Sequence, residues 1–224
     1  MTFAVISFYT PNYKIGDHTK EVNTIYCKQH NYTYLSYSKV PEYLKDRHPA
    51  WCKLHYLLEN MKTKTFDYVM WIDADAFFCN NDIKIEEWID KAKDKRIIIS
   101  RDPGYSLEQY EQHPKRLNSG VMIFKTCDEN IELLTYMLHE PIFKGNYSFV
   151  RSRNQVTGET GWEQAAIRYC FIKNILNMKN STYVNMDTNF NNNTNNVDEY
   201  IKHGGYIIHL TNFMSKFRAR KMNT

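Results

Sequence analysis

Short runs of apolar residues alternate along the chain with segments whose apolar residues recur every three or four positions. Apolar runs bounded by turn-forming residues predict buried strands, and the three-to-four spacing predicts helices packed on one face. Strands are expected at residues 3–9, 32–38, 68–78, 96–100, 119–125 and 204–210. Helices are expected at residues 19–31, 50–61, 85–92, 130–140 and 161–174. Repeated strand–helix–strand units predict an α/β fold with helices flanking a largely parallel sheet.

Two segments have more specific patterns. In the helix expected at residues 19–31, Val22, Ile25 and Tyr26 fall on one face, and we expect that face to be buried. The segment at residues 189–196, "NFNNNTNN", is low in complexity, and we expect a loop there.

Length and composition indicate a single domain. With 224 residues, of which 42% are hydrophobic, the chain is long enough for one well-buried core and short for two. It has no internal repeat and no second apolar region, so we expect one domain over residues 1–224. The sequence leaves open whether a full-length protein carries further domains.

Charge and cysteine patterns exclude several classes of protein. The 29 basic and 25 acidic residues are interspersed, without the dense basic block of a nucleic-acid-binding or membrane-surface protein. Five widely spaced cysteines without a CxxC pair argue against a zinc knuckle or a disulfide framework and favour a reducing compartment. There is no apolar run of about 18 residues and no signal-peptide pattern at the start. We therefore expect a cytoplasmic protein with no nucleic-acid partner and no integral membrane segment.

Asp73 and Asp75 stand inside the apolar run "YVMWIDADAFF" at residues 68–78. An ionised carboxylate in apolar surroundings costs several kcal/mol unless it is compensated, so we expect both to have partners. Side chains two apart on a strand point to the same face, which predicts that the carboxylates lie together at the carboxyl end of the strand, where ligands bind in open α/β sheets. A divalent cation would remove their repulsion. The alternative is that they are turn and capping residues that close the strand.

A cation held by two carboxylates keeps free positions that phosphate oxygens often fill, which suggests two enzyme classes. In a haloacid-dehalogenase-type phosphohydrolase, Asp73 would attack phosphorus and Asp75 would act as general acid or base. In a sugar-nucleotide transferase, the pair and its metal would hold the diphosphate leaving group. The hydrolase predicts Thr or Val soon after the pair and a later "DD", whereas Ala76 and Phe77 follow here and no "DD" occurs. A carbohydrate-binding or nucleotide-sugar-binding module without catalysis is a third possibility.

Two further stretches favour the transferase. "RLNSGVMIFK" places an Asn-Ser-Gly turn before an apolar strand, where Gly120 would let the backbone approach a ligand closely. "GWEQAAIRY" opens a helix with Glu163 and Gln164, whose side chains and neighbouring free N–H groups could face a polar substrate. An Asx turn and an ordinary helix start are the alternatives.

The stretch "YIIHLTNFMSKF" ends a strand at His209, a borderline metal ligand suited to manganese. Lys216 follows seven residues later as a candidate phosphate contact. A histidine satisfied by a backbone carbonyl is the alternative.

The succession "WCKLHYLLENM", "DYVMWIDADAFFCN", "LNSGVMIFK", "GWEQAAIRY" and "YIIHL" resembles the glycosyltransferases of GT-A fold, with a Rossmann-like nucleotide-sugar-binding domain. It is most similar to the galactosyl- and mannosyltransferase family typified by yeast Golgi mannosyltransferases and plant xyloglucan xylosyltransferases, and is similar also to the glycogenin-like family. The resemblance covers roughly residues 1–217. It implies a UDP-sugar donor, a glycan acceptor, Mn²⁺ or Mg²⁺ as cofactor, and retention of anomeric configuration.

The resemblance also implies roles for individual residues. Asp73 and Asp75 would match the family's DxD motif, with His209 as the third metal ligand. The pocket for the uracil and ribose would include Thr10, Asn12 and Tyr13. The residues matching the surroundings of the diphosphate and donor sugar are Lys53, Asp73, Ala74, Asn118, Ser119, Gly120 and Lys216. Glu163 and Gln164 would match the acid–Gln pair beside the anomeric carbon, and an inverting reaction would instead need a carboxylate base, Glu163 or Asp102.

The sequence departs from the family pattern at several points. Relatives often carry Asp where Glu163 stands, and the glycogenin-like "HxxGxxKPW" ending here has Asn212 for Gly and Phe217 after Lys216. We also expect no membrane anchor of the kind usual in the family, because the sequence has no long apolar run. The Asn-, Lys- and Tyr-rich composition is typical of an AT-rich coding genome, which favours a large DNA virus, acting in the host cytoplasm, or a bacterium as the source.

Overall fold

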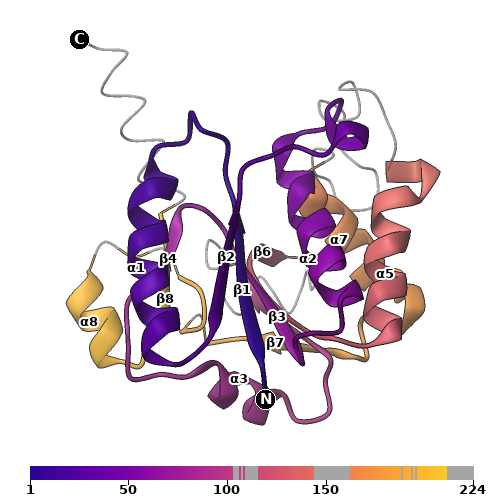
Figure 1. Ribbon diagram of the computed structural model, residues 1–224. Coiled ribbons are helices and arrows are strands. Elements are labelled where there is room, and N and C mark those ends of the chain that lie inside the picture. Colours follow the sequence, from indigo (N-terminus) through magenta and orange to yellow (C-terminus); the bar gives the residue numbers. More distant parts are fainter. Residues whose placement is uncertain are drawn as a thin grey trace.

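A six-stranded sheet forms the centre of the molecule (Figure 1). Its strand order is β2-β1-β3-β6-β5-β7. The computed structural model describes residues 1–102, 106, 108, 116–143, 162–187, 189–192, 194 and 196–210. The central strands are β1 (Phe3–Phe8), β2 (Thr33–Tyr37), β3 (Tyr68–Ile72), β5 (Ile97–Arg101), β6 (Leu117–Lys125) and β7 (Thr182–Asn185). A separate antiparallel pair is made by β4 (Ala76–Phe78) and β8 (Ile207–His209).

The central sheet is mostly parallel, as the sequence predicts, with β6 running antiparallel to both of its neighbours, β3 and β5. Ile72 at the end of β3 pairs with Val121, and the Asp73 N–H donates to the Gly120 carbonyl at 2.8 Å. The reversed direction therefore brings the start of β6 to the edge where β1 and β3 end. Residues from the beginning of one strand and the ends of two others meet there.

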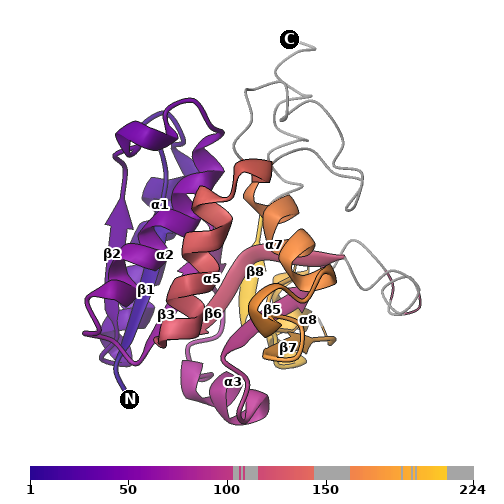
Figure 2. The same cartoon turned by 90° about the vertical axis from the view of Figure 1, so that its right-hand side faces the viewer.

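Helices cover both faces of the sheet (Figures 1 and 2). On one face lie α2 (Cys52–Lys62), α5 (Asp128–His139) and α7 (Glu163–Ile172), and on the other lie α1 (Ile15–Gln29), α3 (Ile85–Ala92) and the β4–β8 pair. The remaining helix is α8 (Val197–Lys202), and short 3₁₀ turns occur at η1 (Glu42–Leu44), η2 (Pro49–Trp51), η3 (Pro141–Phe143) and η4 (Ile175–Asn177).

Two apolar cores result, one on each face of the sheet. Successive strand residues alternate between them, since side chains along a strand point to opposite faces. In β3, Val69 and Trp71 pack towards α2, whereas Met70 and Ile72 pack towards the α1 face. A strand buried on both sides explains the continuous apolar run in its sequence.

The run at residues 68–78 is two strands rather than one. After β3 the chain makes a turn through residues 73–75, in which the Ala76 N–H donates to the Asp73 carbonyl at 2.9 Å, and β4 then joins the other sheet. Apolar character continues through the break because both strands are buried, so the pattern does not reveal it.

The buried face of α1 also differs from the prediction. Val22 and Ile25 are 40% and 56% exposed, whereas Tyr26 is buried as expected. Thr19 and Asn23 are buried in their place, because they bond to the backbone of the 73–75 turn and β4. In the described part of the chain, no helix combines the length and apolar character needed to cross a bilayer.

Candidate active site

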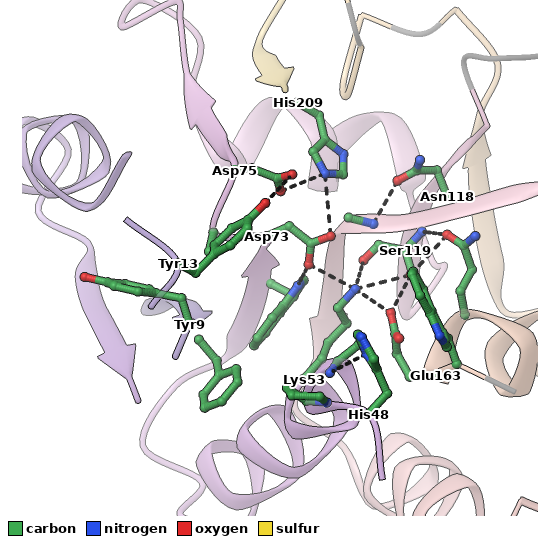
Figure 3. Close-up of a pocket in the computed structure, with 18 of the residues that line it drawn as sticks. Tyr9, Tyr13, His48, Lys53, Asp73, Asp75, Asn118, Ser119, Glu163 and His209 are labelled. Carbon is green, nitrogen blue, oxygen red and sulfur yellow. Dashed lines mark hydrogen bonds and ion pairs between the residues drawn. The ribbon is translucent and has the colours of Figure 1, made fainter. Parts of the chain in front are cut away.

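A cavity of about 650 Å³ opens at the carboxyl ends of β1 and β3 (Figure 3). This volume lies within the usual range for small-molecule sites, about 300–1,000 Å³. Most of the predicted site residues line it: Thr10, Tyr13, Lys53, Asp73, Ala74, Asp75, Asn118, Ser119, Gly120, Glu163, Gln164 and His209. Strand ends, a turn, the start of β6 and the starts of α2 and α7 thus build one site from distant parts of the chain.

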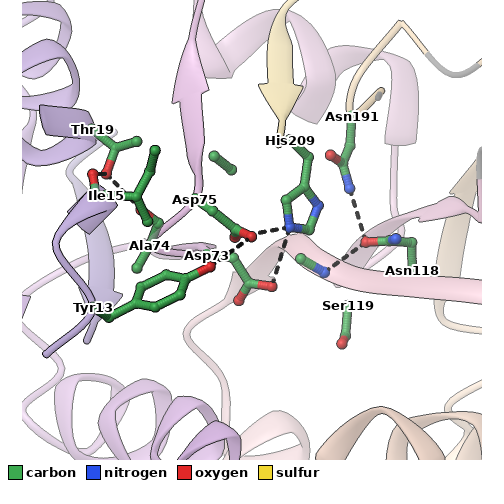
Figure 4. A network of polar contacts seen from close by, with 12 residues as sticks. Tyr13, Ile15, Thr19, Asp73, Ala74, Asp75, Asn118, Ser119, Asn191 and His209 are labelled. Atoms are coloured by element: carbon green, nitrogen blue, oxygen red, sulfur yellow. Dashed lines mark hydrogen bonds and ion pairs between the residues drawn. The ribbon is translucent and has the colours of Figure 1, made fainter. Parts of the chain in front are cut away.

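Asp73, Asp75 and His209 form a cluster of potential metal ligands in this cavity (Figure 4). His209 Nε2 lies 3.1 Å from Asp75 Oδ1 and 3.6 Å from Asp73 Oδ2. One ligand atom from each residue lies within 4.8 Å of the others. Tyr13 donates its hydroxyl to Asp75 Oδ2 at 3.0 Å and so orients the second carboxylate. Two carboxylates and an imidazole are a suitable donor set for Mn²⁺.

The 73–75 turn and the start of β6 give this cluster its geometry. A Cβ atom at Gly120 would lie 2.1 Å from His209 Cε1, so only glycine leaves room for the imidazole. Thr19 on α1 donates to the Ala74 carbonyl at 2.6 Å and fixes the turn from the other side. The two aspartates therefore converge through a tight turn, and not through strand alternation as the sequence pattern suggested.

Charge couples the three groups. Burial lowers the pKa of His209, but the hydrogen bond and charge of Asp75, together with the charge of Asp73, outweigh it and raise the pKa. Burial alone would raise the pKa of Asp75. The hydrogen bond and charge of His209 and the hydrogen bond from Tyr13 outweigh burial, so the pKa lies below the ordinary value. Burial raises the pKa of Asp73 despite the charges of Lys53 and His209. The carboxylate oxygens of Asp73 and Asp75 therefore stabilise a positive charge placed between them and His209.

Lys53 lies beneath this cluster, with a side chain only 3% exposed. Its Nζ lies 3.0 Å from Asp73 Oδ1 and 2.8 Å from Glu163 Oε1, and it donates to the Ser119 carbonyl at 2.9 Å. Burial lowers the pKa of Lys53, but the charges of Asp73 and Glu163 outweigh it, so the pKa is raised. The ammonium therefore stays charged and joins the metal-ligand side of the cavity to the start of α7.

Glu163 and Gln164 are held by Ser119. The Ser119 N–H donates to Gln164 Oε1 at 2.9 Å, which fixes the orientation of the amide, and the Ser119 hydroxyl donates to Glu163 Oε1 at 3.0 Å. Glu163 Oε2 is buried without a hydrogen-bond partner among the described residues. A buried carboxylate oxygen is normally hydrogen-bonded, so this oxygen needs a donor such as an ordered water or a ligand group.

Two of the predicted residues that the structure describes stand apart from the cavity lining. Asn12 is exposed and does not line it. Asp102 does not line it either: its Oδ2 lies 3.2 Å from Nη2 of Arg168, a buried side chain that also donates through Nε to the Leu117 carbonyl at 2.7 Å. Lys216 lies outside the described residues. The contacts of Asp102 indicate that it helps to hold the junction of β5, β6 and α7.

The structure adds site residues that the sequence reading did not identify. Tyr9, His48 and Trp162 line the cavity. Asn191, from the Asn-rich segment expected to be a loop, is fully buried and donates to Asn118 Oδ1 at 3.0 Å. The sequence could have indicated Trp162, because it directly precedes Glu163 in the "GWEQ" stretch. Tyr9, His48 and Asn191 stand in no motif that marks them as site residues.

Comparison with known proteins gives a family match over most of the chain. The sequence model of the galactosyl transferase GMA12/MNN10 family matches residues 9–212. No curated protein sequence matches the chain significantly.

Among solved structures, the chain is similar to a glycosyltransferase involved in the glycosylation of the major capsid of PBCV-1. The TM-score is 0.65 at 14% sequence identity, with 95% of this chain and 94% of that chain covered. A second structure, A197 from STIV, gives a TM-score of 0.39 at 13% identity over 83% of this chain and 82% of that one, which is too low to support an argument. The first similarity shows that the two proteins share a fold.

Proposed function

Because the chain belongs to the galactosyl transferase GMA12/MNN10 family, we propose that it is a metal-dependent enzyme that transfers a hexosyl or deoxyhexosyl group from a UDP-sugar to a sugar hydroxyl of a glycan, with retention. The observation that carries the proposal is the convergence of Asp73, Asp75 and His209 beside the Lys53–Glu163 pair in one cavity. The haloacid-dehalogenase interpretation has no support, since the family and the fold are those of glycosyltransferases.

Asp73, Asp75 and His209 would hold the metal, Mn²⁺ or Mg²⁺. A divalent cation bound there would offset the negative charge that develops on the departing diphosphate. Tyr13 and Lys53 keep the two carboxylates oriented, since each bonds to one of them. Tyr9, Thr10 and Tyr13, from the end of β1 and the segment that follows it, would contact the nucleoside.

On the other side of Asp73, Glu163 and Gln164 would face the donor sugar. The unpaired Oε2 of Glu163 supplies negative charge for an oxocarbenium-like carbon, a role that does not require proton transfer. Ser119 keeps Glu163 and Gln164 in place through its backbone N–H and its hydroxyl. We assign no catalytic role to Asp102, because it does not line the cavity.

Slow hydrolysis of donors without acceptor tests this proposal. In a panel of UDP- and GDP-sugars, we expect one UDP-sugar to be hydrolysed, and only with Mn²⁺ or Mg²⁺. Proton NMR before mutarotation should show the retained anomer first. Asp75→Asn should reduce turnover by about a hundredfold or more, since it removes a ligand of the cation that would stabilise the departing diphosphate.

Each contrary result has a distinct meaning. Release of the inverted anomer would overturn retention alone. Metal-dependent nucleotide binding without turnover of any donor would favour a nucleotide-sugar-binding module. Turnover that is independent of metal in the wild type would overturn the roles given to Asp73, Asp75 and His209.

A further inference from the structure

The cavity wall beside Glu163 carries a stacked pair of rings, His48 and Trp162. Their centroids lie 4.5 Å apart and their planes differ by 12°. Trp162 is 46% exposed, whereas the other tryptophans, Trp51, Trp71 and Trp88, are buried. An indole left open at a cavity, with one face supported by a second ring, presents a flat apolar surface to whatever enters.

Hydrogen bonding fixes the polar group that this pair offers. His48 Nδ1 accepts the Ala50 N–H at 3.2 Å, at the start of η2. Burial lowers the pKa of His48 although the charge of Glu163 acts in the opposite direction, which favours the neutral ring. In a neutral imidazole whose Nδ1 is an acceptor, Nε2 carries the hydrogen. The pair therefore presents one open apolar face of the indole, and the imidazole that covers the other face carries one N–H donor, at Nε2.

The stack lies at the end of the cavity opposite the β1 residues. Tyr9 and Tyr13 stand on one side of Asp73, and His48 and Glu163 stand on the other (Figure 3). Trp162 is bonded directly to Glu163, so their Cα atoms are about 3.8 Å apart. The surface thus adjoins the residues proposed to face the donor sugar, on the side away from the nucleoside.

This chemistry matches a sugar ring. One face of a pyranose carries C–H groups that pack against the negative face of an aromatic ring, and its edge carries hydroxyls that accept hydrogen bonds. We propose that Trp162, supported by His48, forms the acceptor subsite, in which a pyranose of the acceptor glycan packs on the indole face that His48 leaves open. The inference rests on the proposed glycosyltransferase function, and it identifies where the second substrate, the acceptor glycan, would bind.

Tryptophan fluorescence tests the subsite without relying on turnover. Because Trp162 is the exposed indole of the four, acrylamide should quench it selectively. The probes are the methyl α- and β-pyranosides of glucose, galactose, mannose, xylose and rhamnose, added to protein with UDP and Mn²⁺. At least one should reduce quenching saturably, and this response should be absent in Trp162→Phe.

Two His48 variants test the support of the indole. Asn can still accept the Ala50 N–H, so His48→Asn keeps the cap while it removes the ring stacked on Trp162. The sugar that protects Trp162 should bind this variant about tenfold more weakly, because the indole is less well ordered. His48→Phe, which restores a ring, should recover part of that loss.

Kinetics provide an independent readout once a donor is known. Trp162→Ala should raise the acceptor KM about tenfold, and by more than it raises the donor KM. Tyr43→Ala is the matched control, because Tyr43 is 50% exposed and does not line the cavity. It should leave both values unchanged.

Three results would overturn the inference. They are the absence of protection by every pyranoside, complete protection by UDP and Mn²⁺ alone, and a larger effect of Trp162→Ala on the donor KM than on the acceptor KM. Failure of the proposed function would look different, since the wild type would then turn over no nucleotide sugar whatever the fluorescence shows.

Discussion

At the scale of single residues, Gly120 determines whether His209 can reach the two aspartates. Gly120→Ala places a methyl group where His209 Cε1 and Nδ1 now lie, at 2.1 and 2.5 Å from the new Cβ. We expect Mn²⁺ affinity to fall by about 10–100-fold, as when a ligand loses its orientation, while the fold survives. Calorimetry of Mn²⁺ binding checks this. His209→Ala should give a similar loss, and unchanged affinity in Gly120→Ala would refute the steric argument.

Lys53 is the second residue on which the site depends. Lys53→Met leaves the buried carboxylate of Glu163 and the partly buried carboxylate of Asp73 without their shared cation, which should destabilise the protein by about 3–5 kcal/mol. Urea unfolding measures the change. Lys62→Met on the same helix is the control, because the Lys62–Glu59 pair is half exposed and should contribute about 0–1 kcal/mol.

A double variant tests whether the unpaired charge of Glu163 causes the loss of stability in Lys53→Met. Glu163→Gln in the Lys53→Met background should recover part of the lost stability, because it removes one of the unpaired charges. Strict additivity of the two changes would contradict the pairing.

The positions of site residues were predictable where the chain carries compact motifs. Asp73, Asp75 and His209 converge as the motifs predicted. Whether Asp102 reaches the cavity could not be predicted. The sequence shows a carboxylate after a strand, but it does not show that Arg168 from α7 pairs with it. His48 could not be found either, since its role comes from stacking on a residue more than 100 positions away.

At the scale of elements, α1 holds the site from behind. Asn23 donates to the Ala76 carbonyl at 3.1 Å and accepts the Phe78 N–H at 3.1 Å. Asn23→Leu would leave both backbone groups buried and unpaired, so we expect a loss of about 2–4 kcal/mol in unfolding free energy. Ile25→Ala on the exposed face should change it by less than about 0.5 kcal/mol. Equal effects in thermal or urea unfolding would contradict the assignment of the buried face.

Long, regular elements were predictable, and short ones were not. The apolar run of β1 and the spacing in α2 gave correct elements, whereas the run at residues 68–78 was predicted as one strand and divides into β3 and β4. The four-residue β7 and six-residue α8 are too short for a period to stand out. The face of α1 was misassigned because its buried positions are polar and are satisfied by the backbone of a distant turn, which hydrophobic periodicity does not register.

At the scale of the whole molecule, the described chain is one α/β unit whose cores hold buried thiols. All five cysteines lie in described segments and are free. Burial raises the pKa of Cys27, Cys52, Cys79 and Cys170 to about 12. The antiparallel direction of β6 was not predictable, because an apolar run carries no information on strand direction.

These thiols predict how stability depends on pH. Unfolded thiols ionise above roughly pH 8.5, whereas the folded ones keep their protons, so the folded state binds more protons and stability falls as pH rises. The fully buried thiols of Cys27, Cys52 and Cys170 should each cost about 1–2 kcal/mol between pH 8 and pH 10, and the partly exposed thiol of Cys79 should cost less. Urea unfolding across this range checks the slope, and Cys170→Ala should reduce it. A flat profile would contradict the burial of the thiols.

The central claim is that Asp73, Asp75 and His209 bind a nucleotide diphosphate through a divalent cation. Calorimetric titration with UDP, with and without Mn²⁺, is the direct test. It compares the wild type with Asp75→Asn and with the control Asp90→Asn, which changes an exposed carboxylate on α3. We predict that Mn²⁺ strengthens UDP binding about tenfold or more in the wild type and in Asp90→Asn, and has little effect in Asp75→Asn. Equal UDP affinity with and without Mn²⁺ in the wild type, or a full Mn²⁺ effect in Asp75→Asn, would contradict it.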